Sequence, residues 1–278
     1  MKIMSIPIPD LCVVTAANIE YKAVTERLRD CQHSQTNGLK QCRGRAGRNF
    51  VTVLQSEIGA HGFKQKLAAH LSAHKYDALF IIGLAGALSP ELKTGEVIFY
   101  DTCFVFRPEF EMSNNNATAD QCSVCDFQVS SSLRQLLLEE GLACMFGAGL
   151  TLDFMVTTPE EKLAMGESYG AAAVDMESHD VIAVGTEFGL PVIVLRVILD
   201  EATQKTPDFN MALDAMGQMN NLKALFSMLL RPIAAIQFFF SLSHAMKVLR
   251  RATKVALLAE PKLLRTATAM VLARKTWG

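Results

Sequence analysis

The sequence predicts an α/β protein built as a three-layer α/β/α sandwich with a mixed, mostly parallel central sheet and a C-terminal helical extension. Short apolar runs rich in β-branched residues alternate with segments of helical spacing between residues 10 and 200. The chain has 278 residues, of which 50% are hydrophobic, so it can bury one sizeable core. Residues 222–251 are strongly apolar and then basic, which sets the end of the chain apart from the rest.

Strands are expected where short apolar runs are bounded by turn residues. These runs lie at residues 11–17, 39–57 (a hairpin whose turn holds Gly44 and Gly47), 77–88, 95–106, 143–152, 171–176 and 190–200. Helical spacing and helix-start residues predict helices at 18–30, 64–76 and 131–141, and from Thr158 and Ser178. The polar run at 111–121 is expected to be a surface loop.

Composition and charge exclude several classes of protein. The formal charge of -1 argues against nonspecific nucleic-acid binding as the main task, so no nucleic-acid partner is expected. The N-terminus lacks the basic start and apolar run of a secretory signal, and no uninterrupted apolar stretch reaches the roughly 18 to 20 residues of a membrane span. Seven scattered cysteines fit free thiols in a reducing compartment. We therefore expect a cytoplasmic protein.

Three acids fall where strands of the predicted sheet end. Glu20 follows the first strand, Glu177 follows AAAVDM, and Asp200 closes LPVIVLRVILD. A single acid after a strand is usually a helix cap or a solvated turn. Three of them are harder to explain in that way, because the carboxyl ends of parallel strands meet in one crevice where ligands bind. A carboxylic acid near a carboxylate provides one proton donor and one group that holds water or sugar hydroxyls.

Other motifs carry weaker signals. GLAG (83–86) follows a buried strand and is interpreted either as a tight glycine turn or as backbone placed close to a ligand; it is neither a GxGxxG fingerprint nor a P-loop. GRAGR (44–48) favours a basic hairpin tip over a phosphate cradle. CSVC (122–125) lacks two further ligands at regular spacing, so no metal is expected. Ser178 lacks the GxSxG setting of a serine-hydrolase nucleophile, so that class of enzyme is not expected. Asp175 and His179 are interpreted as structural supports.

Three segments together resemble the nucleoside phosphorylase and nucleosidase superfamily, which includes methylthioadenosine/S-adenosylhomocysteine nucleosidases. They are TAANIEYKAV (15–24), FIIGLAGALSPELKTGEVIFYD (80–101) and AAVDMESHDVIAVGTEFGLPVIVLRVILDEA (172–202). In that family one strand ends in Met-Glu, here Met176 and Glu177, and a later strand ends in Arg-x-x-x-Asp, here Arg196 to Asp200. The resemblance implies a catalytic domain over 10–221, followed by a helical, apolar then basic extension over 222–278.

The resemblance also implies a role for each matching residue. Asp200 would donate a proton to N7 of the purine, and Glu20 would position or deprotonate the attacking water. Glu177 would hold the ribose 2′- and 3′-hydroxyls, with Met176 against the sugar. The remaining contacts would come from Phe154, which stacks on the base, and from Ala85 and Gly86, which line the ribose and base. The reaction requires no metal or redox cofactor.

VDMESH and the long basic tail more closely resemble the hopanoid-associated phosphorylase-like proteins, to which removal of adenine from adenosylhopane is attributed. The implied function is hydrolysis of an adenosyl-lipid in hopanoid biosynthesis. Leu84 and Leu199 stand where methylthioadenosine enzymes usually carry small hydroxyl residues, and SEIGAHG (56–62) lacks the basic phosphate loop of true phosphorylases. The two leucines remove polar contacts and argue against methylthioadenosine as the substrate, and the missing phosphate loop favours water over phosphate as the nucleophile.

Two alternatives stay open. One is a purine nucleoside phosphorylase or a methylthioadenosine/S-adenosylhomocysteine nucleosidase, and the other is a catalytically silent nucleoside-binding or membrane-associated scaffold. The family resemblance implies a homodimer or larger homo-oligomer. Composition alone slightly favours packing for the tail, but a lipid substrate would favour a peripheral contact of residues 222–254 with the inner face of the cytoplasmic membrane.

Overall fold

The computed structural model describes residues 8–36, 38–56, 62–106, 122–210 and 231–260. Its strands are β1 (Asp10–Thr15), β2 (Arg29–Thr36), β3 (Leu39–Ala46), β4 (Asn49–Gln55), β5 (Ala78–Ala87), β6 (Val97–Val105), β7 (Cys122–Val124), β8 (Cys144–Thr151), β9 (Ala173–Asp175) and β10 (Val192–Asp200). Its helices are α1 (Asn18–Thr25), α2 (Phe63–Ala73), α4 (Phe127–Glu139), α5 (Pro159–Tyr169), α6 (Ser178–Glu187) and α8 (Pro232–Leu258).

The strands form one mixed sheet in the order β10-β6-β8-β9-β5-β1-β4-β3-β2, with β7 paired to β6. β10 pairs with β6 on one side and also runs parallel to β5, so β5, β9, β8, β6 and β10 form a closed circuit. β1 and β10 are both parallel neighbours of β5. The carboxyl ends of these three strands therefore meet at one edge of the sheet.

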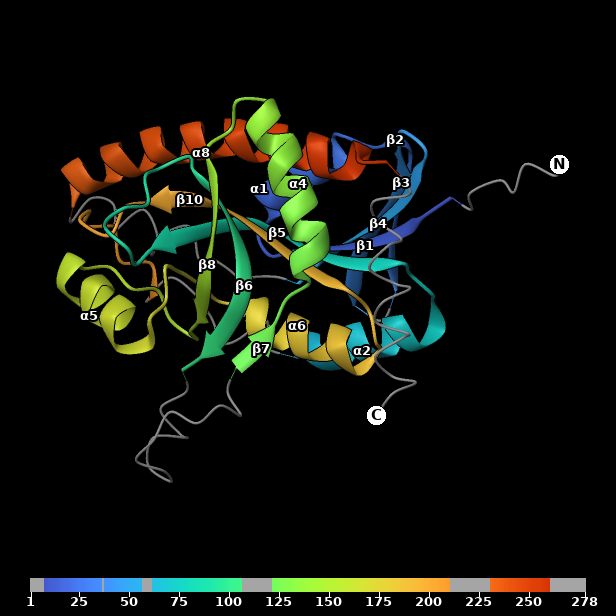
Figure 1. Ribbon diagram of the computed structural model, residues 1–278, viewed down its shortest axis with the longest axis horizontal. Coiled ribbons are helices and arrows are strands. Elements are labelled where there is room, and N and C mark those ends of the chain that lie inside the picture. Colours follow the sequence, from blue (N-terminus) through green and yellow to red (C-terminus); the bar gives the residue numbers. More distant parts are fainter. Residues whose placement is uncertain (1–7, 37, 57–61, 107–121, 211–230, 261–278) are drawn as a thin grey trace, which may run out of the picture.

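Helices cover both faces of the sheet, which confirms the three-layer architecture (Figure 1). One core lies between the sheet and α1, α4 and α8, and the other lies between the sheet and α2 and α6. In Figure 1 the long red α8 runs across the top of the molecule, while α2 and α6 lie below the strands. Both layers form because the inner strands are apolar on each face, as parallel strands covered by helices must be.

Several local expectations are corrected. The first helix ends at Thr25, and its expected last turn continues instead into β2, an exposed edge strand. GLAG is not a turn, because β5 continues through it to Ala87. Gly44 lies within β3, so the hairpin turn holds Gly47, whose φ is 57°. The helix expected from residue 131 begins at Phe127, because Asp126 caps it by accepting a hydrogen bond from the Val129 N–H.

The extension contributes directly to the core. α8 begins with Pro232 at its first turn, where the missing N–H costs nothing. Residues of its C-terminal half, including Ala245, Leu249 and Ala256, are fully buried against the sheet. The Asn49 side chain at the β3–β4 hairpin donates hydrogen bonds to the carbonyls of Leu257 and Ala259. The β3–β4 hairpin, whose tip includes GRAGR (44–48), thus holds the end of α8 through Asn49. Residues 222–230 and 111–121 lie outside the described parts of the chain.

Candidate active site

A cavity of about 640 Å³ opens at the edge where β1, β5 and β10 end. Residues from five parts of the chain that the resemblance singled out all line it. They are Glu20, Ala85, Gly86, Phe154, Met176, Glu177 and Asp200. β9 enters from the other direction, since it runs antiparallel to β5 with Val174 opposite Gly86. This reversal directs Met176 and Glu177 back along β5 into the same cavity.

Glu20 is held at the cavity wall by three backbone N–H groups. Its Oε2 accepts hydrogen bonds from Ala16 (3.0 Å) and Ala17 (2.9 Å), and its Oε1 accepts one from Leu84 (2.7 Å). Each carboxylate oxygen has two lone pairs, so Oε1 keeps one acceptor position for a water molecule. Burial raises the pKa of Glu20, while the Arg196 charge and these hydrogen bonds act in the opposite direction.

Gly83 makes this arrangement possible. A Cβ at this position would lie 2.5 Å from Nη1 of Arg196 and 2.8 Å from Oε1 of Glu20. Only a residue without a side chain lets the guanidinium and the carboxylate approach the same segment of β5. The first glycine of GLAG therefore allows the polar groups to pack closely, within an otherwise regular strand.

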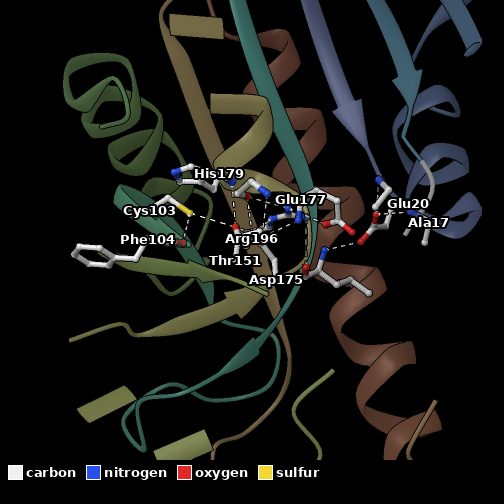
Figure 2. A network of polar contacts seen from close by, with 12 residues as sticks. Ala17, Glu20, Cys103, Phe104, Thr151, Asp175, Glu177, His179 and Arg196 are labelled. Atoms are coloured by element: carbon white, nitrogen blue, oxygen red, sulfur yellow. Dashed lines mark hydrogen bonds and ion pairs between the residues drawn. The ribbon is translucent and has the colours of Figure 1, made fainter. Parts of the chain in front are cut away.

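Arg196 is the centre of a buried polar network. Its Nε forms an ion pair with Asp175 at 3.0 Å, and its Nη2 contacts Glu177 Oε2 at 3.3 Å and Ser178 Oγ at 2.9 Å. Figure 2 shows the network extending from Cys103 and Thr151 through Asp175 and Arg196 toward Glu177, with Glu20 at the far end. A guanidinium suits this position because its fixed donors can serve several acceptors at once.

Asp175 orients the start of α6. Its carboxylate accepts hydrogen bonds from Thr151 Oγ1 (3.0 Å), from the N–H groups of Glu177 (3.1 Å) and Ser178 (3.0 Å), and from Ser178 Oγ. Burial would raise the pKa of Asp175, but the Arg196 charge and these hydrogen bonds lower it below its usual value. Asp175 is therefore a buried carboxylate that fixes the backbone of Glu177, and Arg196 fixes the Glu177 side chain.

His179 also belongs to this supporting structure. Its backbone N–H donates to Thr151 Oγ1 at 3.0 Å, and its Nδ1 lies 3.8 Å from the carboxylate of Asp180. It lies on the far side of Thr151 from Glu20 in Figure 2. The cavity contacts of this region come instead from Val174 to Glu177.

Asp200 ends β10 and pairs with a fully buried lysine on α5. Lys162 Nζ donates to Asp200 Oδ2 and also to the carbonyls of Glu201 (3.2 Å) and Gln204 (2.9 Å). Burial raises the pKa of Asp200, and the adjacent Lys162 charge limits that rise. A Cβ on Gly86 would lie 3.4 Å from Asp200 Oδ2, so the glycine leaves room beside the carboxyl group.

Most of the remaining cavity wall is apolar, although Asn18, Gln55 and Thr206 also line it. Leu84 and Leu199, the two departures from the methylthioadenosine pattern, both line it, and so does Phe154. The wall is completed by Val156, Phe209 and three residues of α8, namely Phe238, Phe239 and Leu242. The cavity thus has carboxyl groups at the sheet edge and an aromatic, aliphatic region beneath the N-terminal half of α8.

Two important residues were missed by reasoning from the sequence. Arg196 was part of a recognised motif but received no role, although a lone cation within LPVIVLRVILD signals buried acidic partners. Lys162 carries no such signal, because PEEKLAMGESY is rich in charged and polar residues, as an exposed helix would be. Its burial follows only from the packing of α5 against the end of β10.

The chain belongs to the phosphorylase superfamily, whose family pattern it matches over residues 10–234. It is 23% identical over 207 residues to the 5′-methylthioadenosine/S-adenosylhomocysteine nucleosidase of Tolumonas auensis, covering 70% of this chain and 87% of the relative. The enzyme of the same name from Buchnera aphidicola is 26% identical over 196 residues, covering 64% and 81% respectively.

Solved structures share the fold. Futalosine hydrolase of Helicobacter pylori superposes with a TM-score of 0.72 at 17% identity, covering 90% of this chain and 97% of the other. The S-adenosylhomocysteine nucleosidase of Streptococcus pyogenes, solved with 5-methylthiotubericidin, gives a TM-score of 0.71 at 21% identity, covering 91% and 98%. The expected nucleoside phosphorylase-like α/β fold is confirmed by these similarities.

Proposed function

We propose that this protein is a purine nucleosidase that hydrolyses the N-glycosidic bond of an adenosyl-lipid, converting adenosylhopane to ribosylhopane and adenine in hopanoid biosynthesis. One observation carries the proposal: Glu20, Glu177 and Asp200 line a single cavity whose other wall is apolar. The acids suit cleavage of a nucleoside, and the apolar wall suits a hydrocarbon at the 5′ position. Membership of the phosphorylase superfamily and the nucleosidase relatives support the reaction class.

Two buried carboxyl groups would divide the proton transfers. Protonated Asp200 gives its proton to N7 of adenine while the C1′–N9 bond breaks, and the bonding electrons leave with the base. Water adds to C1′ and loses its proton to Glu20, so the proton lost by Asp200 is balanced by the one that Glu20 gains. The raised pKa of Asp200 suits a proton donor. The three N–H donors on Glu20 favour its carboxylate form.

Glu177 would hold the ribose while positive charge develops on the sugar. Its carboxylate is fixed by Arg196, and it follows Met176, which also lines the cavity. Hydrogen bonds to two hydroxyls and a nearby negative charge both stabilise an oxocarbenium-like state. Phe154 would cover the base, with Ala85 and Gly86 beneath the ribose and base.

The charges around the cavity favour water over phosphate as the nucleophile. No lysine or arginine is found among the described residues that line the cavity, whereas four acids are, namely Glu20, Asp175, Glu177 and Asp200. A phosphate dianion would meet these carboxyl groups directly, because Arg196 and Lys162 stand behind the wall and already pair with them. The 56–62 segment, which was expected to lack a phosphate loop, falls largely outside the described residues.

The 5′ substituent would lie beneath α8. Phe238, Phe239 and Leu242 form that wall, and Leu84 and Leu199 remove polar contacts nearby. A second candidate is a methylthioadenosine/S-adenosylhomocysteine nucleosidase, which the names of the sequence relatives favour. Adenosylhopane carries a much longer apolar 5′ group than methylthioadenosine does, so the relative turnover of these two compounds separates the candidates.

A peripheral membrane contact would bring a lipid substrate to the cavity. Four large apolar side chains on the N-terminal half of α8 are exposed by more than half, namely Ile233, Ile236, Phe239 and Phe240. Among the described residues, α8 is the one helix long and apolar enough to cross a bilayer by length and composition. Because its C-terminal half is buried in the core, we propose that it lies along the membrane surface instead.

Replacement of Asp200 tests the reaction chemistry. Asp200→Asn removes the proton donor, so adenine release from adenosyl substrates should fall by roughly 10²- to 10⁴-fold, the usual contribution of a general acid. Asp153→Asn is the matched control, because Asp153 is an exposed aspartate next to Phe154. Near-normal turnover in the Asp200 variant would refute the assignment.

A further inference from the structure

A second cluster of reactive side chains lies on the β2–β3 hairpin. Cys31 and His33 are on β2 and Cys42 is on β3, with His33 directly opposite Cys42 in the antiparallel register. Cys31 precedes His33 by two residues and therefore faces the same side of the strand. One ligand atom from each of the three lies within 4.8 Å of the other two.

A β-bulge turns Cys31 toward this cluster. Asp30 and Cys31 together oppose Gly44, between the pairs Arg29–Arg45 and Gln32–Arg43. A Cβ on Gly44 would lie 2.8 Å from the Arg29 carbonyl oxygen and 3.4 Å from Cys31 Sγ, so glycine is required beside the sulfur. The bulge and the glycine thus create space for a side chain that would otherwise project from an edge strand.

The histidine is oriented by a neighbour on α1. Tyr21, which follows Glu20, places its hydroxyl 3.2 Å from His33 Nδ1. Histidine ligands are commonly held in this way, with one ring nitrogen on a hydrogen-bond partner and the other on the metal. His33 Nε2 is therefore the nitrogen available to a cation.

Cys42 provides a fixed ligand at the base of the cluster. It is fully buried, and it packs in the same core as Tyr21 and Val24. A divalent cation bound here would be coordinated by the thiolate of Cys42, and the thiol proton would be released to solvent.

We infer that Cys31, His33 and Cys42 form a binding site for a thiolate-preferring divalent cation of the Zn²⁺ type. Two sulfurs and one imidazole suit zinc and disfavour Mg²⁺ and Ca²⁺, which prefer oxygen ligands. In a tetrahedral zinc site such ligand atoms lie roughly 3.5 to 3.8 Å apart. Here the ligand atoms lie within 4.8 Å of one another, so binding requires the exposed side chains of Cys31 and His33 to move closer to Cys42.

Solvent would supply the fourth ligand, because the site opens at the surface of the hairpin. The cation would fasten β2, whose eight residues are all exposed, to the core behind β3. Spacing along the chain does not reveal the site, since Cys42 is brought to His33 by the strand register. The cluster consists of residues other than those that line the catalytic cavity, so the cation takes no part in the proposed hydrolysis.

Cobalt titration tests the site directly. The full chain is stripped of metal with a chelator, kept reduced with a phosphine, and titrated with Co²⁺. We expect one Co²⁺ per chain with a thiolate-to-cobalt charge-transfer band that Zn²⁺ abolishes, and a higher Tm on adding Zn²⁺. Cys31→Ser and His33→Ala, both at exposed positions, should lose the band while retaining the fold by circular dichroism.

Two further variants refine the test. Cys122→Ser replaces a half-buried cysteine outside the cluster and should bind Co²⁺ as the unaltered chain does. Tyr21→Phe keeps the ring but removes the hydroxyl from His33, and should weaken Co²⁺ binding roughly tenfold. Absence of the band in the reduced chain, or equal Co²⁺ affinity in the Cys31→Ser and His33→Ala variants, would overturn the inference.

Discussion

At the scale of single residues, the site depends on how burial and nearby charge act on each carboxyl group. Burial raises the pKa of both Glu20 and Asp200. Asp175, equally buried, has a lowered pKa because Arg196 and several hydrogen-bond donors stabilise its charge. Glu20 and Asp200 thus have the raised pKa values that suit groups taking part in proton transfer, whereas Asp175 is kept charged and supports the site.

Lys162 should set the pH range over which Asp200 can donate. Lys162→Met removes the charge that lowers the Asp200 pKa and leaves burial, which raises it. The acid then stays protonated to higher pH, so the alkaline limb of kcat/KM should move to higher pH. The measurement is the pH profile of adenine release.

Lys205→Met is the control for this prediction, because Lys205 is an exposed lysine in the segment after β10. Its profile should match that of the unaltered chain. A Lys162→Met variant that folds and keeps an unshifted alkaline limb would show that Lys162 has only a structural role. The same result would remove Asp200 as the titrating acid.

At the scale of elements, α8 combines two roles along its length. Its C-terminal half packs in the core, so deleting the tail would disrupt the fold and cannot isolate a membrane contact. Its N-terminal half contributes Phe238 and Phe239 to the cavity and leaves Phe240 75% exposed. Phe238 therefore belongs to the cavity wall and Phe240 to the exposed face, while Phe239, which is 54% exposed, belongs to both.

Replacing these phenylalanines one at a time should separate the two roles. Phe238→Ser should raise KM for a lipid-linked adenosyl substrate in detergent by roughly tenfold, because an apolar contact of the cavity wall is lost, and should change KM for methylthioadenosine much less. Phe240→Ser should leave both KM values unchanged and reduce binding to anionic liposomes. Equal effects of Phe238→Ser on both substrates would contradict the lipid assignment, and unchanged liposome binding by Phe240→Ser would contradict the membrane contact.

Elements also show where sequence patterns are informative. The alternation of strands and helices predicts the fold class, because apolar periodicity reflects burial directly. It does not reveal β2, whose polar, fully exposed residues carry no apolar pattern. GLAG resembles a turn because glycine usually marks one, whereas here Gly83 allows Arg196 and Glu20 to pack against a continuous strand.

At the scale of the whole molecule, the site exists because distant segments meet at one sheet edge. The three acids that the family motifs single out, Glu20, Glu177 and Asp200, come from separate parts of the chain and line one cavity. No local pattern could place Lys162 or the phenylalanines of α8 there, because their positions depend on how α5 and α8 pack on the sheet. The division of the chain at residue 221 stays a proposal, as does assembly into a homo-oligomer.

The most direct test of the proposed function is product analysis with a lipid-linked adenosyl substrate. The purified chain is incubated with adenosylhopane, methylthioadenosine or inosine, with and without phosphate, and the base and sugar products are measured by mass spectrometry. We predict adenine and free ribosyl-lipid at equal rates with and without phosphate, and faster turnover of adenosylhopane than of methylthioadenosine. Phosphate-dependent release with a ribose 1-phosphate product, or turnover of methylthioadenosine alone, would contradict the proposed function.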